Sequence, residues 1–147
     1  MKSYLDFAEN DYLFFMDAYE HCTTFGPLAS IAQNICEKYL KHLIDTFVQP
    51  EDEIEALQKE NILKVHSLVK LIRFLKNEMK IKIPKDVEAS MRIIDGYYFS
   101  TRYPGDDAFF ADAEDIENSA DAIKLTRQFV YDTIKQLNSN NPAKLNI

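Results

Sequence analysis

The chain has 147 residues, of which 46% are hydrophobic and 28% charged, an ordinary balance for one globular domain with its own core. Three glycines and five prolines are too few for a β-sandwich or barrel, which needs a turn signal about every ten residues. The net charge of −7 disfavours general binding to duplex DNA, although residues 59–92 carry nine basic and four acidic side chains and leave a local anion site open.

The first predicted helix spans residues 4–23, with Ser3 as its N-cap. Its apolar surface is wide, because phenylalanines flank the main stripe. We therefore expect burial on two sides, by the bundle and by a second subunit. The stripe consists of Leu5, Ala8, Tyr12, Phe15, Tyr19 and Cys22, and it is widened by Phe7, Phe14 and Met16.

The clearest helix is predicted over residues 28–48, where apolar residues recur at spacings of three and one without a break. Pro27 fits the first turn, where its missing N–H costs nothing. Gly26 breaks the previous helix, and Pro50 closes the far end of this one.

The middle of the chain is expected to contain one long helix. Residues 50–60 are polar, and we predict a loop or short turn there that leads into a third helix over 61–80. Asn61 is its expected N-cap, and Pro84 lies beyond its end.

Two more helices complete the pattern. A fourth is predicted over 86–100 with Asp86 as its cap, and a fifth over 112–138, after a turn marked by a Pro-Gly pair. The sequence thus predicts an all-α fold, an up-down antiparallel four- or five-helix bundle over residues 1–138, followed by a polar tail over 139–147.

The cellular setting is predicted by elimination. No apolar run approaches the roughly 18 residues that span a bilayer, and acidic residues interrupt the apolar start, so neither a membrane span nor a signal peptide is expected. Cys22 and Cys36 lack CxxC spacing, which favours reduced core thiols over a disulfide. A cytoplasmic location follows.

Three short motifs lie on the predicted helices. Residues 31–44 carry a Glu-Lys-x-x-Lys face, residues 66–71 read His-x-Leu-x-x-Leu, and residues 98–104 read Tyr-x-x-x-Arg-Tyr-Pro before an acidic stretch and a long helix. Together they resemble the HEPN domain family (higher eukaryotes and prokaryotes nucleotide-binding). The resemblance implies a helical bundle, commonly dimeric, whose relatives partner or are fused to a minimal nucleotidyltransferase, or act as ribonuclease toxins.

The family's ribonuclease motif is absent. It consists of an Arg followed four to six residues later by a His. Here the histidines are His21, His42 and His66, whereas the first arginine is Arg73, so no Arg precedes any His. The general acid–base pair of the motif cannot be assembled in the usual way.

Arg102 is the first candidate ligand-binding residue. It lies in a turn stiffened by Pro104, and Tyr98, one helical turn earlier, can stack beneath its guanidinium to make a planar fork suited to phosphate. The alternative is that Arg102 anchors its own loop through a nearby acid, since structural ion pairs imitate functional sites. The nearby acids are Asp95, Asp106 and Asp107.

Four other side chains have two interpretations each. His66 opens the third predicted helix, as an acid/base or phosphate contact, or as a satisfied core or interface residue. Lys38 and Lys41 lie on the predicted outer face of the second helix, as part of a phosphate-binding surface or as a solvated face. Arg127 falls on the fifth helix's apolar stripe, reaching past the bundle edge or pairing across a subunit interface.

Metal and cofactor sites are not expected. Seven acids and no bases lie between Asp106 and Asp121, but their spacing matches no calcium loop, and acids suit the first turn of a helix. The cysteines and histidines lack zinc-ligand spacing, and no nucleophile–base pair, dinucleotide fingerprint or P-loop is found. We therefore predict no catalytic residues.

We expect a non-catalytic HEPN-like binding module that forms a homodimer and binds a nucleotide or other small anion, or docks a minimal nucleotidyltransferase partner. Two alternatives stay open: a toxin-like ribonuclease with an unconventional active site, and a structural dimerisation or partner protein. Neither duplex DNA nor a membrane is an expected partner. The predicted ligand-binding residues are Arg102, Tyr98, His66, Tyr103, Lys38 and Lys41.

Overall fold

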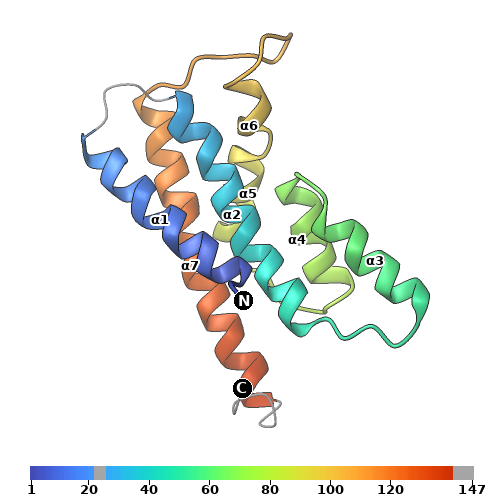
Figure 1. Ribbon diagram of the computed structural model, residues 1–147. Coiled ribbons are helices and arrows are strands. Elements are labelled where there is room, and N and C mark those ends of the chain that lie inside the picture. The colour runs from blue at the N-terminus through green and yellow to red at the C-terminus, as the bar shows by residue number, and fades with distance from the viewer. Residues whose placement is uncertain (22–25, 141–147) are drawn as a thin grey trace.

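The computed structural model describes residues 1–21 and 26–140, and all regular secondary structure in those residues is helical. The predicted all-α fold is confirmed. Long helices run up and down the molecule, and a shorter pair packs at one side (Figure 1). The helices are α1 (Tyr4–His21), α2 (Gly26–Phe47), α3 (Glu53–Leu63), α4 (Leu68–Asn77), α5 (Lys85–Ile94), α6 (Tyr97–Ser100) and α7 (Ala113–Asn140).

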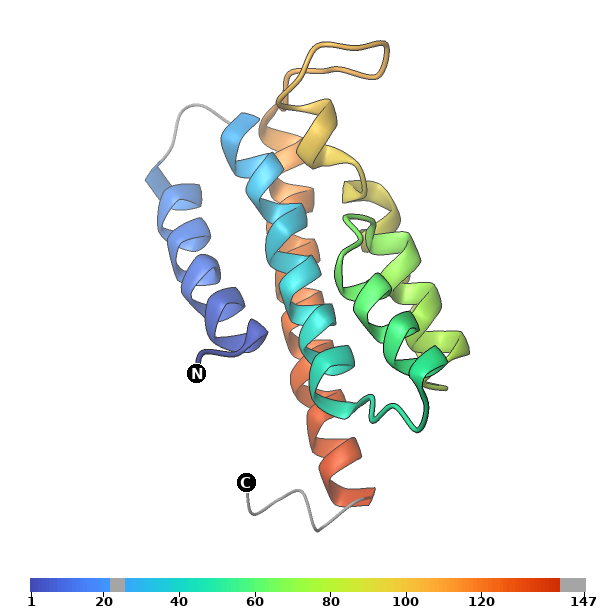
Figure 2. The same ribbon diagram turned by 45° about the vertical axis from the view of Figure 1, so that its right-hand side comes forward.

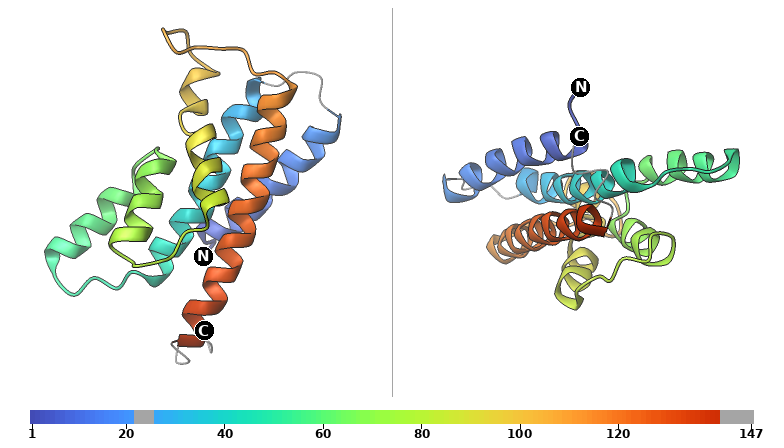
Figure 3. Two further views of the ribbon diagram at one scale, coloured as in Figure 1. Left: turned by 180° about the vertical axis from the view of Figure 1, so that it is seen from behind. Right: turned by 90° about the horizontal axis from the view of Figure 1, so that it is seen from below.

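The bundle is built around α2. Along the chain, α1 and α5 run in one direction and α2 and α7 in the other (Figures 1 and 2). Seen from below, α1, α2 and α3 form one row, and α7 and α5 lie beneath it (Figure 3). Because α2 contacts every other helix, most of its surface is buried, and polar as well as apolar side chains of α2 are enclosed.

The first two helices begin as their sequences predict. The Ser3 hydroxyl accepts a hydrogen bond from the Asp6 N–H at 3.2 Å, and the Asp6 carboxylate accepts one from the Ser3 N–H at 2.8 Å. This reciprocal cap confirms Ser3 at the start of α1. Pro27 occupies the first turn of α2, as predicted, while Gly26 begins that helix.

The predicted loop over 50–60 is wrong, because most of it is helix α3. Asp52 caps this helix by accepting a hydrogen bond from the Glu55 N–H at 2.8 Å. The predicted cap Asn61 lies inside α3.

The predicted single helix over 61–80 is also wrong, because the chain leaves the helix after Leu63 and begins α4 at Leu68. The Ser67 hydroxyl accepts from the Lys70 N–H at 3.2 Å, and Asp95 accepts from the Leu68 N–H at 2.8 Å. Two oxygens thus satisfy the orphan N–H groups of a new helix start.

The predicted fourth helix is divided at Gly96, whose φ of 92° is left-handed and separates α5 from α6. The expected cap Asp86 is wrong as well, since Pro84 occupies the N-cap position of α5. The last helix matches its predicted range closely, and Asp112 and Asp115 cap its start reciprocally. Most of the predicted polar tail, residues 141–147, lies outside the described residues.

Most of the apolar stripe predicted over residues 28–48 is buried in the core. Cys36 is a free, buried thiol, and burial raises its pKa to about 12, so it packs as a small apolar group. Cys22 lies outside the described residues. Within the part of the chain that the structure describes, no helix is both long and apolar enough to cross a membrane.

One side of α1 is buried against the bundle and the other is open. Ala8 and Phe15 are fully enclosed, whereas four large apolar side chains of α1 remain exposed. The predicted burial on the second side therefore requires a partner. The exposed residues are Phe7, Leu13, Phe14 and, from the predicted stripe itself, Tyr19.

Candidate functional site

A pocket of about 570 Å³ opens beside the middle of α2. The start of α1, the loop before α4, and α6 with the turn that follows it form its other walls. Five of the six predicted ligand-binding residues line this one pocket. They are Lys38, Lys41, His66, Tyr98 and Tyr103, and the remaining lining residues are Tyr4, Asn34, Glu37 and Phe99.

Two opposite charges are buried at the wall that α2 supplies. Glu37 and Lys41 lie one helical turn apart and are only 3% and 5% exposed, with Lys41 Nζ 3.7 Å from Glu37 Oε2. Burial lowers the pKa of Lys41, and the neighbouring Glu37 opposes that shift. The predicted solvated face is therefore wrong for Lys41, because neighbouring elements pack over this part of α2.

Gln33, one turn before Glu37, joins three segments through one side-chain amide. Its Nε2 donates to Glu37 Oε1 at 3.2 Å and to the His66 carbonyl at 2.9 Å, while its Oε1 accepts from the Tyr98 N–H at 3.0 Å. The amide is fully buried, so these bonds are expensive to lose. Sequence reasoning missed Gln33, although the polar i, i+4 series Gln33–Glu37–Lys41 was visible on one helix face.

His66 lies in the loop before α4, not on a core stripe. Its side chain is 65% exposed, and Nδ1 lies 3.2 Å from Glu37 Oε2. The interpretation as a core residue is wrong. A buried carboxylate orients the imidazole at the mouth of the pocket, where the rest of the ring faces solvent.

Arg102 stands beside the pocket with its guanidinium stacked on tyrosine. The Cζ atom lies 4.7 Å from the Tyr98 ring centroid and 5.7 Å from that of Tyr103, which matches the predicted stack. Among the residues that the structure describes, no carboxylate forms an ion pair with Arg102. Asp95, one of the predicted loop anchors, instead accepts hydrogen bonds at the start of α4.

Lys38 lies on the α1 side of the pocket and forms an ion pair with Asp11. The contact ties α1 to α2 beside the pocket mouth. Since the carboxylate offsets the lysine charge, Lys38 contributes less to an anion site than its position alone indicates.

The comparison with known families decides the class of protein. The family model of the HEPN domain matches residues 4–137. The chain belongs to the HEPN domain family. A search of the curated proteins and of the solved structures finds no significant match. Because the match extends from the first residue of α1 almost to the end of α7, every wall of the pocket is part of the HEPN domain itself.

A second charged group of this HEPN domain lies away from the pocket. Arg127 on α7 donates to both carboxylate oxygens of Glu9 on α1, at 2.7 and 3.0 Å, and Tyr39 on α2 donates to Glu9 at 2.6 Å. Burial and the carboxylate raise the pKa of Tyr39 above its usual value. Both sequence interpretations of Arg127 are wrong, since its partner is within the chain.

The acidic stretch before α7 has a structural use. Asp112 and Asp115 cap the helix, and the Tyr97 hydroxyl donates to Asp115 at 3.4 Å. Burial, with Asp115 adding to it, raises the pKa of Tyr97 to about 12. In the described residues no three His, Cys, Asp or Glu side chains are arranged to hold a metal ion.

Proposed function

We propose that this HEPN domain is a non-catalytic binding module whose pocket takes a mononucleotide or a similar ligand that joins a planar ring to a phosphate. The observation that carries the proposal is the Arg102 guanidinium, which has no carboxylate partner among the described residues and is stacked on Tyr98 and Tyr103, two of the aromatic residues that line the pocket. A guanidinium fixed on a ring presents its donors in the planar arrangement that phosphate oxygens match.

The aromatic side chains supply the second half of the ligand. Tyr103 and Phe99 are half exposed, and both line the pocket. Stacking of a nucleobase on such a ring is worth about 1–3 kcal/mol and is tolerant of base identity. One of these exposed rings, Tyr103 or Phe99, therefore binds the base while Arg102 binds the phosphate.

The charge balance favours a small anion over a long nucleic acid. Glu37 offsets the charge of Lys41, and Asp11 offsets that of Lys38, so both lysines that line the pocket are compensated, whereas no described carboxylate pairs with Arg102 beside it. A polynucleotide needs a basic track that follows its backbone. One free guanidinium beside two neutralised lysines suits one or two phosphates.

Isothermal titration calorimetry tests the proposal directly. AMP, GMP, CMP and UMP are titrated into the wild-type protein, with adenosine and inorganic phosphate as the two halves of the ligand. A mononucleotide is expected to bind more tightly than either half. Arg102→Ala is expected to weaken it by about 10- to 100-fold, the worth of a charge-assisted hydrogen bond.

Two further variants sharpen the result. Arg102→Lys keeps the charge but loses the planar fork, so it should recover only part of the affinity. Lys124→Ala removes an exposed cation from α7, away from the pocket lining, and should bind as the wild type does. Equal affinity in the wild type and Arg102→Ala, or no binding of any mononucleotide, would show that the proposal is wrong.

A ribonuclease is the alternative function, and the contact between His66 and Glu37 favours it. A carboxylate that orients an imidazole is a common arrangement for general acid–base catalysis. The family motif that normally supplies the histidine is absent. Cleavage of single-stranded RNA by wild-type protein, lost in both His66→Ala and Arg102→Ala, would replace the binding proposal with this one.

The homodimer and the nucleotidyltransferase partner stay predictions. HEPN domains often form dimers, and α1 offers four exposed apolar side chains, Phe14 among them, for such an interface. Light scattering on the wild type and on Phe14→Ser tests this surface. A dimer that persists unchanged in Phe14→Ser would place the interface elsewhere.

A further inference from the structure

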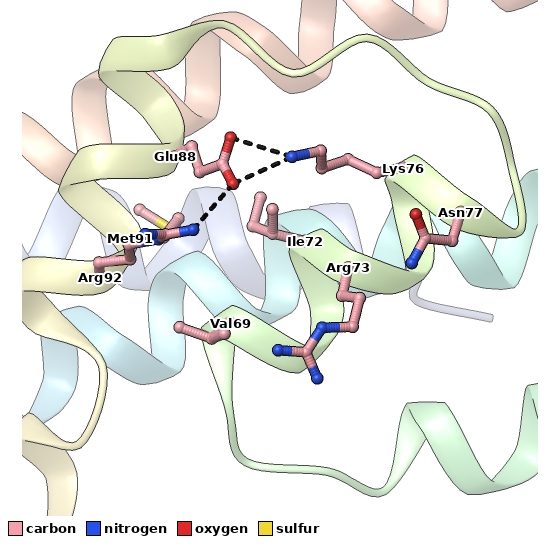
Figure 4. Close-up of a pocket in the computed structure, with 8 residues that line it drawn as sticks. All are labelled: Val69, Ile72, Arg73, Lys76, Asn77, Glu88, Met91 and Arg92. Atoms are coloured by element: carbon pink, nitrogen blue, oxygen red, sulfur yellow. Dashed lines mark hydrogen bonds and ion pairs between the residues drawn. The ribbon is translucent and has the colours of Figure 1, made fainter.

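A small groove lies between α4 and α5, apart from the nucleotide pocket. It encloses about 220 Å³. Its base is apolar, formed by Val69 and the buried side chains of Ile72 and Met91 (Figure 4). An apolar cavity of roughly 150 Å³ is large enough to hold a benzene molecule. The groove therefore has room for one aromatic side chain.

The rim of this groove is strongly basic. Glu88 accepts from Lys76 at 3.1 Å and from Arg92 at 3.3 Å, so one carboxylate is shared by two cations. Figure 4 shows the Arg73 guanidinium on the other side of Ile72, and no described carboxylate forms an ion pair with it. Three cations against one anion leave an excess of positive charge around an apolar base.

The loop that follows α6 has the complementary shape and charge. Phe110 is 99% exposed. Its neighbour Phe109 is 37% exposed and packs its ring 5.5 Å from the Tyr97 ring, while the Phe109 N–H donates to the Ser100 carbonyl at 2.9 Å. The loop is thus anchored through one phenylalanine and presents the next to solvent. Between Tyr103 and α7 its charged residues are Asp106, Asp107 and Asp112, and it has no basic residue.

The loop lies at the opposite side of α6 from the groove. Figures 1 and 2 show it projecting from the end of the bundle, whereas α4 and α5 pack lower on the molecule. Because the loop is anchored next to α6, it does not lie against the groove of its own chain. A fully exposed phenylalanine and an empty aromatic-sized groove on one chain are the two halves of a contact between copies.

We propose that Phe110 of one copy inserts into the α4–α5 groove of a second copy of this chain. The phenyl ring packs on Ile72 and Met91, and Arg73 lies at the rim, where a guanidinium contacts an aromatic ring favourably. The aspartates of the loop meet the basic rim. This contact is separate from the nucleotide pocket and from the exposed side of α1.

The contact joins two different surfaces of the chain. Where only one loop of a pair inserts, each copy keeps one unused loop or groove, and the association closes into a ring or extends into a filament; where both loops insert, it closes as a two-fold dimer. In either case it predicts a signature that an interface made by one patch alone lacks: a variant without the loop residue and a variant without the groove charge complement each other.

Sedimentation velocity over a range of protein concentrations tests this contact. The wild type is expected to form species larger than those of Phe110→Ser or Arg73→Glu, and either substitution should weaken the association by roughly 10- to 100-fold, the worth of one buried aromatic ring. Both residues are exposed, so both variants should fold, which circular dichroism checks. Added salt should weaken the wild-type association further.

The decisive step mixes the two variants. An equimolar mixture of Phe110→Ser and Arg73→Glu retains one intact loop and one intact groove, and it should sediment faster than either variant alone. Phe14→Ser, which removes an equally apolar exposed residue from α1, should leave this contact intact. A wild type no larger than Phe110→Ser at any concentration, or a mixture that sediments as the sum of its components, would overturn the proposal.

Discussion

Two arginines of this HEPN domain are flanked by tyrosines in nearly the same way. Arg127 lies 4.8 and 5.1 Å from the ring centroids of Tyr12 and Tyr131, and Arg102 lies 4.7 and 5.7 Å from those of Tyr98 and Tyr103. The difference is the carboxylate. Glu9 accepts two hydrogen bonds from Arg127, whereas no described carboxylate pairs with Arg102.

The comparison separates a structural arginine from an available one. Stacking on tyrosine orients both guanidinium groups, but only at Arg127 are the donors used within the chain, in a contact that joins α1 to α7. At Arg102 no described carboxylate takes up the donors, and for that reason we propose Arg102 as the phosphate-binding residue. Glu37, the carboxylate that lines the adjoining pocket, is engaged by Gln33, Lys41 and His66.

The largest loss of stability is expected from removing the carboxylate of Glu37. Glu37→Leu leaves Lys41 buried without its partner, and breaking a buried pair in this way costs about 3–5 kcal/mol. Urea unfolding at neutral pH measures the loss. Glu37→Leu combined with Lys41→Met removes the stranded charge and should be more stable than the single variant. A double variant less stable than Glu37→Leu would mean that the lysine charge is already solvated.

A smaller loss of stability is expected when Arg127, the arginine paired with Glu9, is removed. Arg127→Ala removes two charge-assisted hydrogen bonds and the stacking between two tyrosines, but Glu9 is partly exposed and can take up water. We expect a loss of roughly 1–3 kcal/mol in the free energy of unfolding. Hydrogen exchange should show faster opening of α1 than of α5. Uniform protection loss in both helices would argue against a role in docking α1.

The fold was predictable because the helical periodicity of apolar residues and the residues that begin and end helices agree along most of the chain. The uninterrupted apolar stripe of α2 and the acidic start of α7 are local signals, and both helices match their predicted ranges. The two helix breaks that the sequence did not predict, after Leu63 and at Gly96, have a common cause. Asp95 bonds to the start of α4, 27 residues away, while Gly96 turns the chain behind it. A long-range cap of this kind has no local pattern.

The site was predicted in part for a different reason. Family-like motifs pointed to five of the nine residues that line the pocket, but they did not indicate which of those residues is buried. Lys41 looks like a surface lysine because it follows polar residues on a helix. Its burial depends on how many neighbours α2 has, and only the packing of the whole bundle determines that number.

Acid should affect the contacts of Arg127, which is paired with Glu9, more than those of Arg102, which pairs with no described carboxylate. Arg127 hydrogen bonding holds the pKa of Glu9 below its usual value of 4.5, and a carboxyl whose pKa is depressed in the folded state stabilises the protein above that value. That contribution is lost as the pH falls below about 4.5. Glu9→Gln should therefore lose less stability than the wild type between neutral pH and pH ~3, as thermal unfolding across this range will show. Parallel curves would mean that the pair is not formed in solution.

The smallest effect on stability, and the sharpest use of the comparison, is expected for Arg102→Ala. Arg102 is exposed and pairs with no described carboxylate, so its removal should change the free energy of unfolding by less than about 0.5 kcal/mol. Thermal unfolding without ligand, beside Arg127→Ala, measures this directly. A saturating mononucleotide should affect the two variants differently: Arg127→Ala should still gain stability from the ligand, while Arg102→Ala should gain little. If Arg102→Ala is as destabilised as Arg127→Ala without ligand, Arg102 is a structural residue too, and the tyrosine stack alone would explain its position.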